Sequence, residues 1–135
     1  MGVYVDKYFG YFMDVTEEYN KSKQLWDDYY DGKMDNPELI ALKVVPYYSD
    51  IKQKEDDITL LYDGMCGEYS KLVLIKTVEK YSDDESEPNE RANDMLKLVP
   101  IPPEIKERME KVYKIVFGES QNCPTIYLMQ FAHFH

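Results

Sequence analysis

The sequence predicts an α+β domain in which two or three helices pack on a mainly antiparallel sheet of four to five strands. Three observations support this prediction. Residues 58–62 and 69–81 are rich in Ile, Leu, Val and Tyr, and the segment between them holds two glycines, which is typical of a β-hairpin. Residues 103–117 carry apolar side chains at helical spacing. The 135 residues show no internal repeat and fit a single domain, 1–135.

The first strand is expected over residues 3–13, where Val, Tyr and Phe are frequent. Gly10 in its middle indicates a β-bulge or the close approach of another backbone. Asp14 is then expected to cap a helix, with Glu17 three residues later. This helix is expected to end at Gly32. Its apolar stripe comprises Val15, Tyr19, Ser22, Trp26 and Tyr29 or Tyr30.

The middle of the chain is expected to hold a turn, an edge segment and the hairpin. Residues 34–37 form the turn, and Pro46 confines the mixed apolar run of residues 39–48 to a sheet edge or a strand end. Residues 51–57 are charged and predict a loop. Residues 72–75 are apolar on both faces, which indicates a central strand that is covered on both sides.

The last third begins with a strongly acidic stretch. Residues 82–90 contain no apolar side chain and predict a solvated, mobile connector, followed by a short helix over 90–98. Pro103 opens the best-defined helix, which Gly118 ends. The buried stripe of this helix is expected to contain Ile105, Met109, Val112 and Val116. Residues 125–134 predict the final strand.

The charge of the chain restricts its partners. The 26 acidic residues exceed the 16 basic ones, so the formal net charge is −10. Residues 14–31 and 79–91 each hold six acidic and two basic residues, whereas from residue 101 onward the two kinds balance at four each. A surface with this charge repels nucleic acid and anionic lipid and attracts basic partners. We therefore expect no direct nucleic-acid or membrane binding, although the charge also keeps a protein dispersed in water without any further role.

Tyrosine accompanies these acidic stretches. Thirteen tyrosines are present, and Tyr and Trp provide rigid contact area at binding surfaces. Carboxylates pair with the edge of a guanidinium group while aromatic rings accept its face. Trp26 is expected in the helix core, which leaves Tyr29 or Tyr30 as the exposed ring. The predicted partner-binding residues are Glu17, Glu18, Asp27, Asp28, Tyr30, Asp31, Asp83, Asp84 and Glu85.

The residues that can carry catalysis are few. Cys66 lies in a glycine-flanked turn, and the chain has two histidines, His133 and His135, which share one face of a strand and could join a carboxylate at a metal site. No phosphate-binding loop, dinucleotide fingerprint or calcium loop is present, so no cofactor or metal is expected. Cys66 and Cys123 are expected to be reduced thiols, with a single disulfide as the alternative. The sequence does not decide whether the protein is an enzyme, and it favours a non-enzyme.

In size, acidity and Tyr/Asp content the chain resembles small inhibitors made by phages or mobile elements, a resemblance of composition that assigns no residue. We expect a non-enzymatic inhibitor that docks on the basic surface of a nucleic-acid-handling protein, such as a nuclease or host-defence effector. A nuclease-immunity or antitoxin-like protein is one alternative. A small hydrolase or ligand-binding domain that uses Cys66 and His133 is another. The lack of a signal peptide predicts a cytoplasmic protein, in the host cytoplasm if phages encode it. The oligomeric state is not determined.

Overall fold

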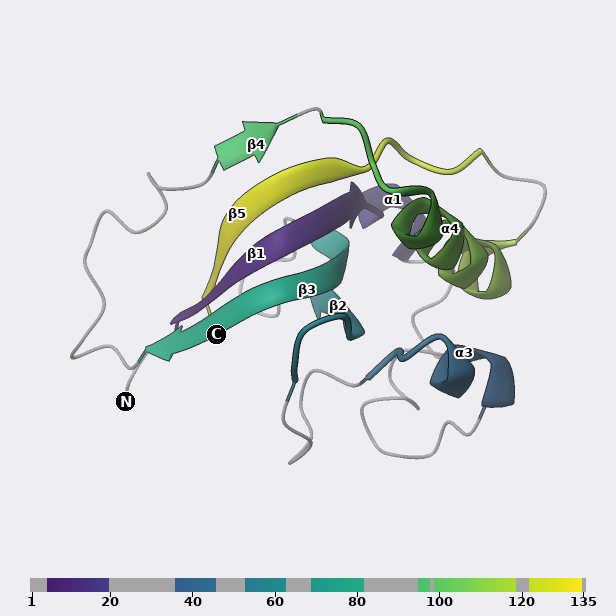
Figure 1. Cartoon of the computed structure of the whole chain (residues 1–135), viewed down its shortest axis with the longest axis horizontal. Helices are drawn as coiled ribbons and strands as arrows, with labels where there is room; N and C mark the ends of the chain where they lie inside the picture. Colours follow the sequence, from purple (N-terminus) through teal and green to yellow (C-terminus); the bar gives the residue numbers. More distant parts are fainter. Residues whose placement is uncertain are drawn as a thin grey trace.

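The computed structural model describes residues 5–19, 36–45, 53–62, 69–81, 95–97, 99–118 and 122–134. A five-stranded sheet has the order β2-β3-β1-β5-β4, and every neighbouring pair is antiparallel (Figure 1). The strands are β1 (Val5–Asp14), β2 (Ile58–Tyr62), β3 (Ser70–Tyr81), β4 (Met95–Lys97) and β5 (Tyr127–Phe134). The described helices are α1 (Thr16–Tyr19), α3 (Pro37–Ala41) and α4 (Pro103–Phe117). The predicted α+β class is confirmed. Within the described residues, no helix is long and apolar enough to cross a membrane.

Strand β1 lies at the centre of the sheet and confirms the first predicted strand. Its pairing with β3 shifts between Phe9 and Gly10, which is the irregularity that the glycine predicted. A Cβ atom on Gly10 would lie 2.1 Å from the backbone oxygen of Leu74. Glycine is therefore required here by the close approach of β3.

The hairpin prediction is confirmed in its two strands. β2 pairs with β3 from Ile58 opposite Leu74 to Tyr62 opposite Ser70. The four residues 72–75 are fully buried, as expected for a strand covered on both faces. The connecting residues 63–68, which include Cys66, lie outside the described residues.

Helix α4 begins at Pro103 and ends at Gly118, as predicted. Met109 and Val112 are fully buried, while Ile105 and Val116 are half-buried against the same core. The predicted stripe omitted two further buried side chains, Tyr113 and Phe117, whose rings lie 5.1 Å apart.

Asp14 lies two residues before the first residue of α1 and binds that residue. The Asp14 carboxylate accepts hydrogen bonds from the Thr16 backbone N–H at 3.0 Å and from the Thr16 hydroxyl at 2.5 Å. Val15 and Tyr19 are buried, as the predicted stripe requires. The predicted continuation to Gly32 lies outside the described residues.

Two sequence predictions are wrong. Residues 37–41 form helix α3 where the run from residue 39 predicted an edge strand, because the Asn36 side chain accepts hydrogen bonds from the N–H groups of Glu38 and Leu39. Within the same run, Val44 does form a bridge with Ile58 at the sheet edge. Residues 95–97 form strand β4 where a short helix was predicted, because they pair with residues 128–130 of β5.

The sheet has a core on each face. On one face, α1, α3 and α4 cover Met13, Leu72 and Leu74 and gather at one end of the sheet (Figure 1). The other face carries a second cluster, which comprises Tyr8, Phe12, Leu61, Val73, Ile75 and Phe131. The ring of Phe131, which lies opposite Tyr8 in register, is 5.9 Å from the ring of Phe12. Both faces therefore bury apolar side chains.

Candidate functional site

The acidic region can be located only in part. Of the predicted partner-binding residues, the structure describes Glu17, which is exposed, and Glu18, which is half-buried. The remaining seven, Asp27, Asp28, Tyr30, Asp31, Asp83, Asp84 and Glu85, lie outside the described residues. Their convergence into one surface stays a prediction.

Glu17 and Glu18 border an acidic groove at the end of β1. Its volume is about 490 Å³, and Asp14, Thr16 and Pro124 also line it. Burial acts to raise the pKa of Asp14, but the two hydrogen bonds from Thr16 and the charge of Lys71 together lower it below its usual value. Asp14 therefore stays ionised at neutral pH, and three carboxyl groups from one short segment surround this groove.

A tyrosine of α4 holds one of these carboxylates. The Tyr113 hydroxyl donates a hydrogen bond of 2.9 Å to Glu18 Oε2. Burial, followed by this hydrogen bond and the nearby negative charge of Glu18, raises the pKa of Tyr113 to about 12. The phenol thus remains protonated and keeps donating across the neutral range. The contact links α1 to α4 and fixes where the Glu18 carboxylate lies.

The negative charge is concentrated in two parts of the chain. Residues 14–31 and 79–91 each carry a net charge of −4 and together account for −8 of the total of −10. Among the described residues, two acidic groups outside these stretches are paired: Lys76 Nζ lies 3.2 Å from Asp56 Oδ1, and Lys111 Nζ lies 3.1 Å from Glu107 Oε1. Most of the excess negative charge therefore belongs to the two acidic stretches.

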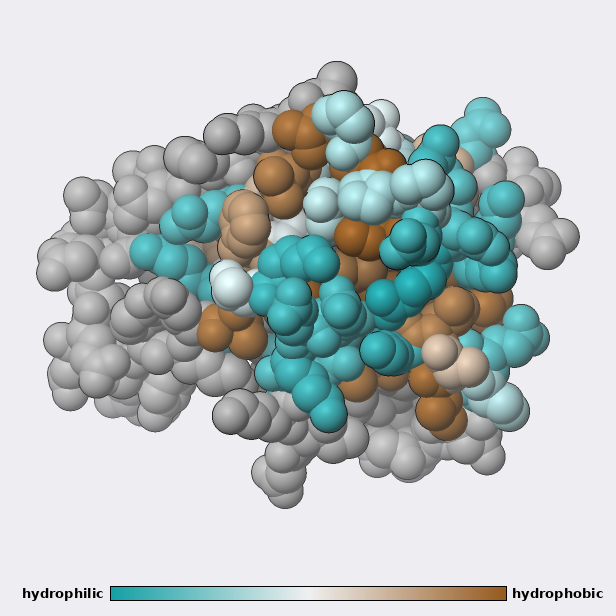
Figure 2. Space-filling view, viewed as in Figure 1, coloured by the Kyte–Doolittle hydropathy of each residue, from teal (hydrophilic) through white to brown (hydrophobic). Residues whose placement is uncertain are grey.

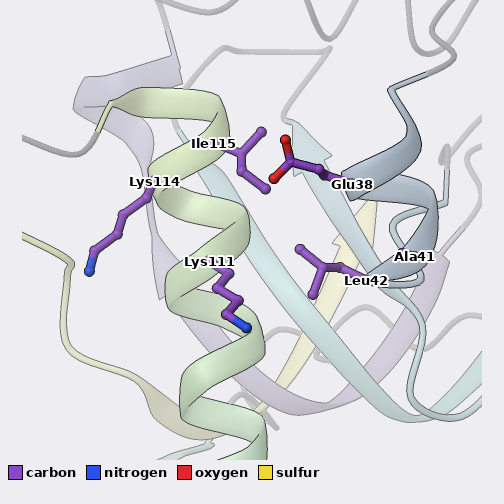
Figure 3. A pocket seen from close by; sticks show the side chains of 6 residues that line it. All are labelled: Glu38, Ala41, Leu42, Lys111, Lys114 and Ile115. Atoms are coloured by element: carbon purple, nitrogen blue, oxygen red, sulfur yellow. The ribbon is translucent and has the colours of Figure 1, made fainter.

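A second groove lies between α3 and α4. It has a volume of about 370 Å³ and is lined by Glu38, Ala41, Leu42, Lys111, Lys114 and Ile115. The side chains of Glu38 and Ile115 point toward each other across it, and Leu42 points toward α4 (Figure 3). Hydrophobic surface is visible between the positions of α4 and α3 in the space-filling view (Figure 2). The groove is therefore apolar at its floor and charged at its rim.

His133 is buried on the face of the sheet that carries the second cluster. It is fully buried, and its Nδ1 atom lies 2.5 Å from the Tyr69 hydroxyl. Asp6, which is also buried, is its register partner on β1. Neither Cys66 nor His135 is among the described residues, so the hydrolase alternative and the histidine metal site stay predictions. Elsewhere in the described part of the chain, no three metal-ligating side chains come together.

Cys123 is a free thiol at a cavity of about 520 Å³ beside the start of α4. Burial and the charge of Glu110 raise the pKa of Cys123, against the opposing effect of Lys114. The thiol is therefore protonated at neutral pH and is a weak nucleophile.

Sequence reasoning identified Asp14 as a helix cap and missed its place in the acidic groove. It also missed the α3–α4 groove, because residues 39–48 were expected to be extended. The signal that predicts α3 is the order Asn36-Pro37-Glu38, an N-cap residue followed by proline at the first helical position and an acidic residue. The contact between Tyr113 and Glu18 spans 95 residues, and no local pattern indicates it.

Comparisons with protein-family models, with curated proteins and with solved structures found no match.

Proposed function

We propose that the protein is a non-enzymatic inhibitor that places an acidic, tyrosine-bearing surface on the basic surface of a nucleic-acid-handling protein, such as a nuclease or host-defence effector. The partner's natural ligand is then excluded from its site. On this proposal the protein acts in the cytoplasm, that of the host if a phage encodes it.

The observation that carries the proposal is the uneven distribution of charge. Residues 14–31 and 79–91 each carry a net charge of −4, whereas residues 101–135 hold four acidic and four basic residues. A charge that served dispersal alone needs no such concentration, since acids scattered evenly along the chain keep a protein soluble equally well. Closely spaced carboxylates resemble the phosphates of nucleic acid in charge and can occupy the same Lys and Arg side chains.

The acidic groove supplies the described part of this surface. Glu17 is exposed, Asp14 is held ionised, and Glu18 is fixed by Tyr113. An arginine from a partner carries five N–H donors in a planar fork, which suits several carboxylate oxygens at once. The predicted acidic residues from Asp27 to Asp31 follow α1 closely in the sequence, which favours one continuous contact region.

The test is affinity capture from a lysate of the source or host organism at two salt concentrations, about 50 mM and about 300 mM, where screening differs strongly. We expect one basic nucleic-acid-binding protein to be retained at low salt and largely lost at high salt. Added DNA should compete with the captured protein for this partner. Capture that resists salt and DNA, or a partner without a basic surface, would contradict the proposal. If the captured partner is a toxin nuclease, the protein would be a nuclease-immunity or antitoxin-like protein that uses the same charge complementarity.

A further inference from the structure

The two walls of the groove between α3 and α4 carry side chains of the same two kinds. Each wall contributes a charged and an aliphatic side chain four residues apart. Glu38 of α3 and its C-cap residue Leu42 form one wall, and Lys111 and Ile115 of α4 form the other. Glu38 faces Ile115 across the gap, while Lys111 extends beside Leu42, and Lys114 is turned away from α3 (Figure 3). The aliphatic groups therefore form the centre of the groove, with a negative group on one wall and a positive group on the other.

The two helices that form this groove are fixed relative to each other by contacts that do not involve Glu38, Lys111 or Lys114. Arg108 of α4 donates hydrogen bonds of 2.8 Å to the backbone oxygens of Leu42 and Asp56. Leu39 anchors α3 in the core with 1% of its surface exposed. Since the two helices are already fixed relative to each other, a ligand would not have to order them on binding.

Within the described part of the chain, the charges at the rim are open to a ligand. Among the described residues, no hydrogen bond or ion pair occupies the Glu38 carboxylate. Lys111 is paired with Glu107 at 3.1 Å, but these side chains are 59% and 67% exposed, so the pair is weak and can be exchanged. A ligand complementary to this groove has an apolar centre, a basic group for Glu38 and an acidic group for Lys111.

We propose that the α3–α4 groove binds a short amphipathic segment of a partner protein. In this segment one aliphatic side chain lies between Leu42 and Ile115, and it is flanked by a basic residue on one side and an acidic residue on the other. This segment is complementary in charge to the groove, because its basic residue can pair with Glu38 and its acidic residue with Lys111. The groove differs from the acidic surface in position and in chemistry, and the inference does not depend on the inhibitor proposal.

The test uses three synthetic Ala-rich peptides of about 20 residues, because isolated helices shorter than about 15 residues are only marginally stable in water. Each has a central leucine with a charged residue one turn before and one turn after it: Lys and Glu in the mixed peptide, two Lys in the basic peptide, and two Glu in the acidic peptide. Binding is followed by the methyl NMR signals of Leu42 and Ile115. We expect the mixed peptide to shift these signals and to bind about fivefold more tightly than either of the others, since each mismatched charge costs roughly 1 kcal/mol.

Glu38→Lys should reverse this preference toward the acidic peptide. Glu38 is exposed, so the variant is expected to fold, and its unshifted core methyl signals verify this. The control, Glu104→Lys, makes the same change in net charge at the start of α4 and should keep the preference of the unmodified protein.

Three results would overturn the inference. The first is an absence of shifts at Leu42 and Ile115 with any peptide. The second is tightest binding of the basic peptide, which the net charge of −10 alone would favour. The third is equal binding of a mixed peptide with alanine in place of leucine, since this removes the aliphatic contact.

Discussion

The two acidic stretches and the C-terminal residues 101–135 differ sharply in charge. Residues 14–31 and 79–91 each hold six acidic and two basic residues, whereas residues 101–135 hold four of each. In the C-terminal part a charged group serves local structure, because Arg108 donates hydrogen bonds to two backbone oxygens. The comparison places most of the excess negative charge in the stretches that we propose to bind the partner. Substitutions at structural contacts should therefore change stability, and those in the acidic stretches should change binding.

The largest effect on the stability of the fold is expected at Gly10. In Gly10→Ala, the new Cβ atom meets the Leu74 oxygen at 2.1 Å, so β1 and β3 must separate, at a cost of about 4 kcal/mol in the free energy of unfolding. Urea denaturation measures this. Gly118→Ala is the control, because its Cβ has no neighbour within 4 Å and only the positive φ of 105° opposes it, at a cost of about 2 kcal/mol. Equal losses in the two variants would mean that the close approach of β3 is not what requires Gly10.

Gly10 also shows what the sequence predicts well. A glycine inside a Val, Tyr and Phe run indicates a bulge, and the periodicity of residues 103–117 predicts α4, because both signals lie in neighbouring residues. The strand at residues 95–97 and the bond from Tyr113 to Glu18 depend on partners far along the chain, so local preference does not reveal them. Glu17 and Glu18 were predicted as partner-binding residues, but the groove that they line was not predicted. The α3–α4 groove depends on a helix that the sequence analysis missed.

The next largest effect is expected at Arg108. Arg108→Met keeps the length of the side chain but leaves the oxygens of Leu42 and Asp56 without these donors, at a cost of about 2 kcal/mol. The unfolding midpoint in urea should fall accordingly. Lys106→Met on the exposed side of the same helix should change it by less than about 0.5 kcal/mol. Similar losses in both variants would show that removing any basic residue from α4 destabilises the protein.

Tyr113→Phe tests the contact between the core and the acidic groove, because Tyr113 is a core residue that donates a hydrogen bond to Glu18. Loss of the bond to Glu18 should cost about 1 kcal/mol at neutral pH. The raised pKa favours the folded state while the phenol is protonated. The stability difference between the two proteins should thus be complete below pH 10, the usual value, and should shrink as the pH rises toward about 12. Urea midpoints across this range measure it, and a difference that stays constant with pH would contradict this assignment.

The smallest effect is expected from Asp14. Its lowered pKa favours folding while the carboxylate is ionised, so this contribution is present above the usual value of 3.8 and is lost as the pH falls through the lower value in the folded protein. Asp14→Asn removes this acid-dependent step and keeps an N-cap side chain. The difference in urea midpoint between the two proteins should therefore change only below about pH 4. A difference independent of pH down to about pH 2 would show that Asp14 has no lowered pKa.

The central claim is that the acidic segments, and not the total charge, bind the basic partner. Its most direct test is the association rate constant of the captured partner with two variants of equal net charge, measured over a series of salt concentrations. Asp27→Lys with Asp28→Lys should slow association at least tenfold at low salt and weaken its salt dependence. Glu55→Lys with Glu104→Lys, which lie outside both acidic stretches, should change the rate constant less than about threefold. Equal slowing in both double variants would show that net charge alone controls binding, and the claim would fail.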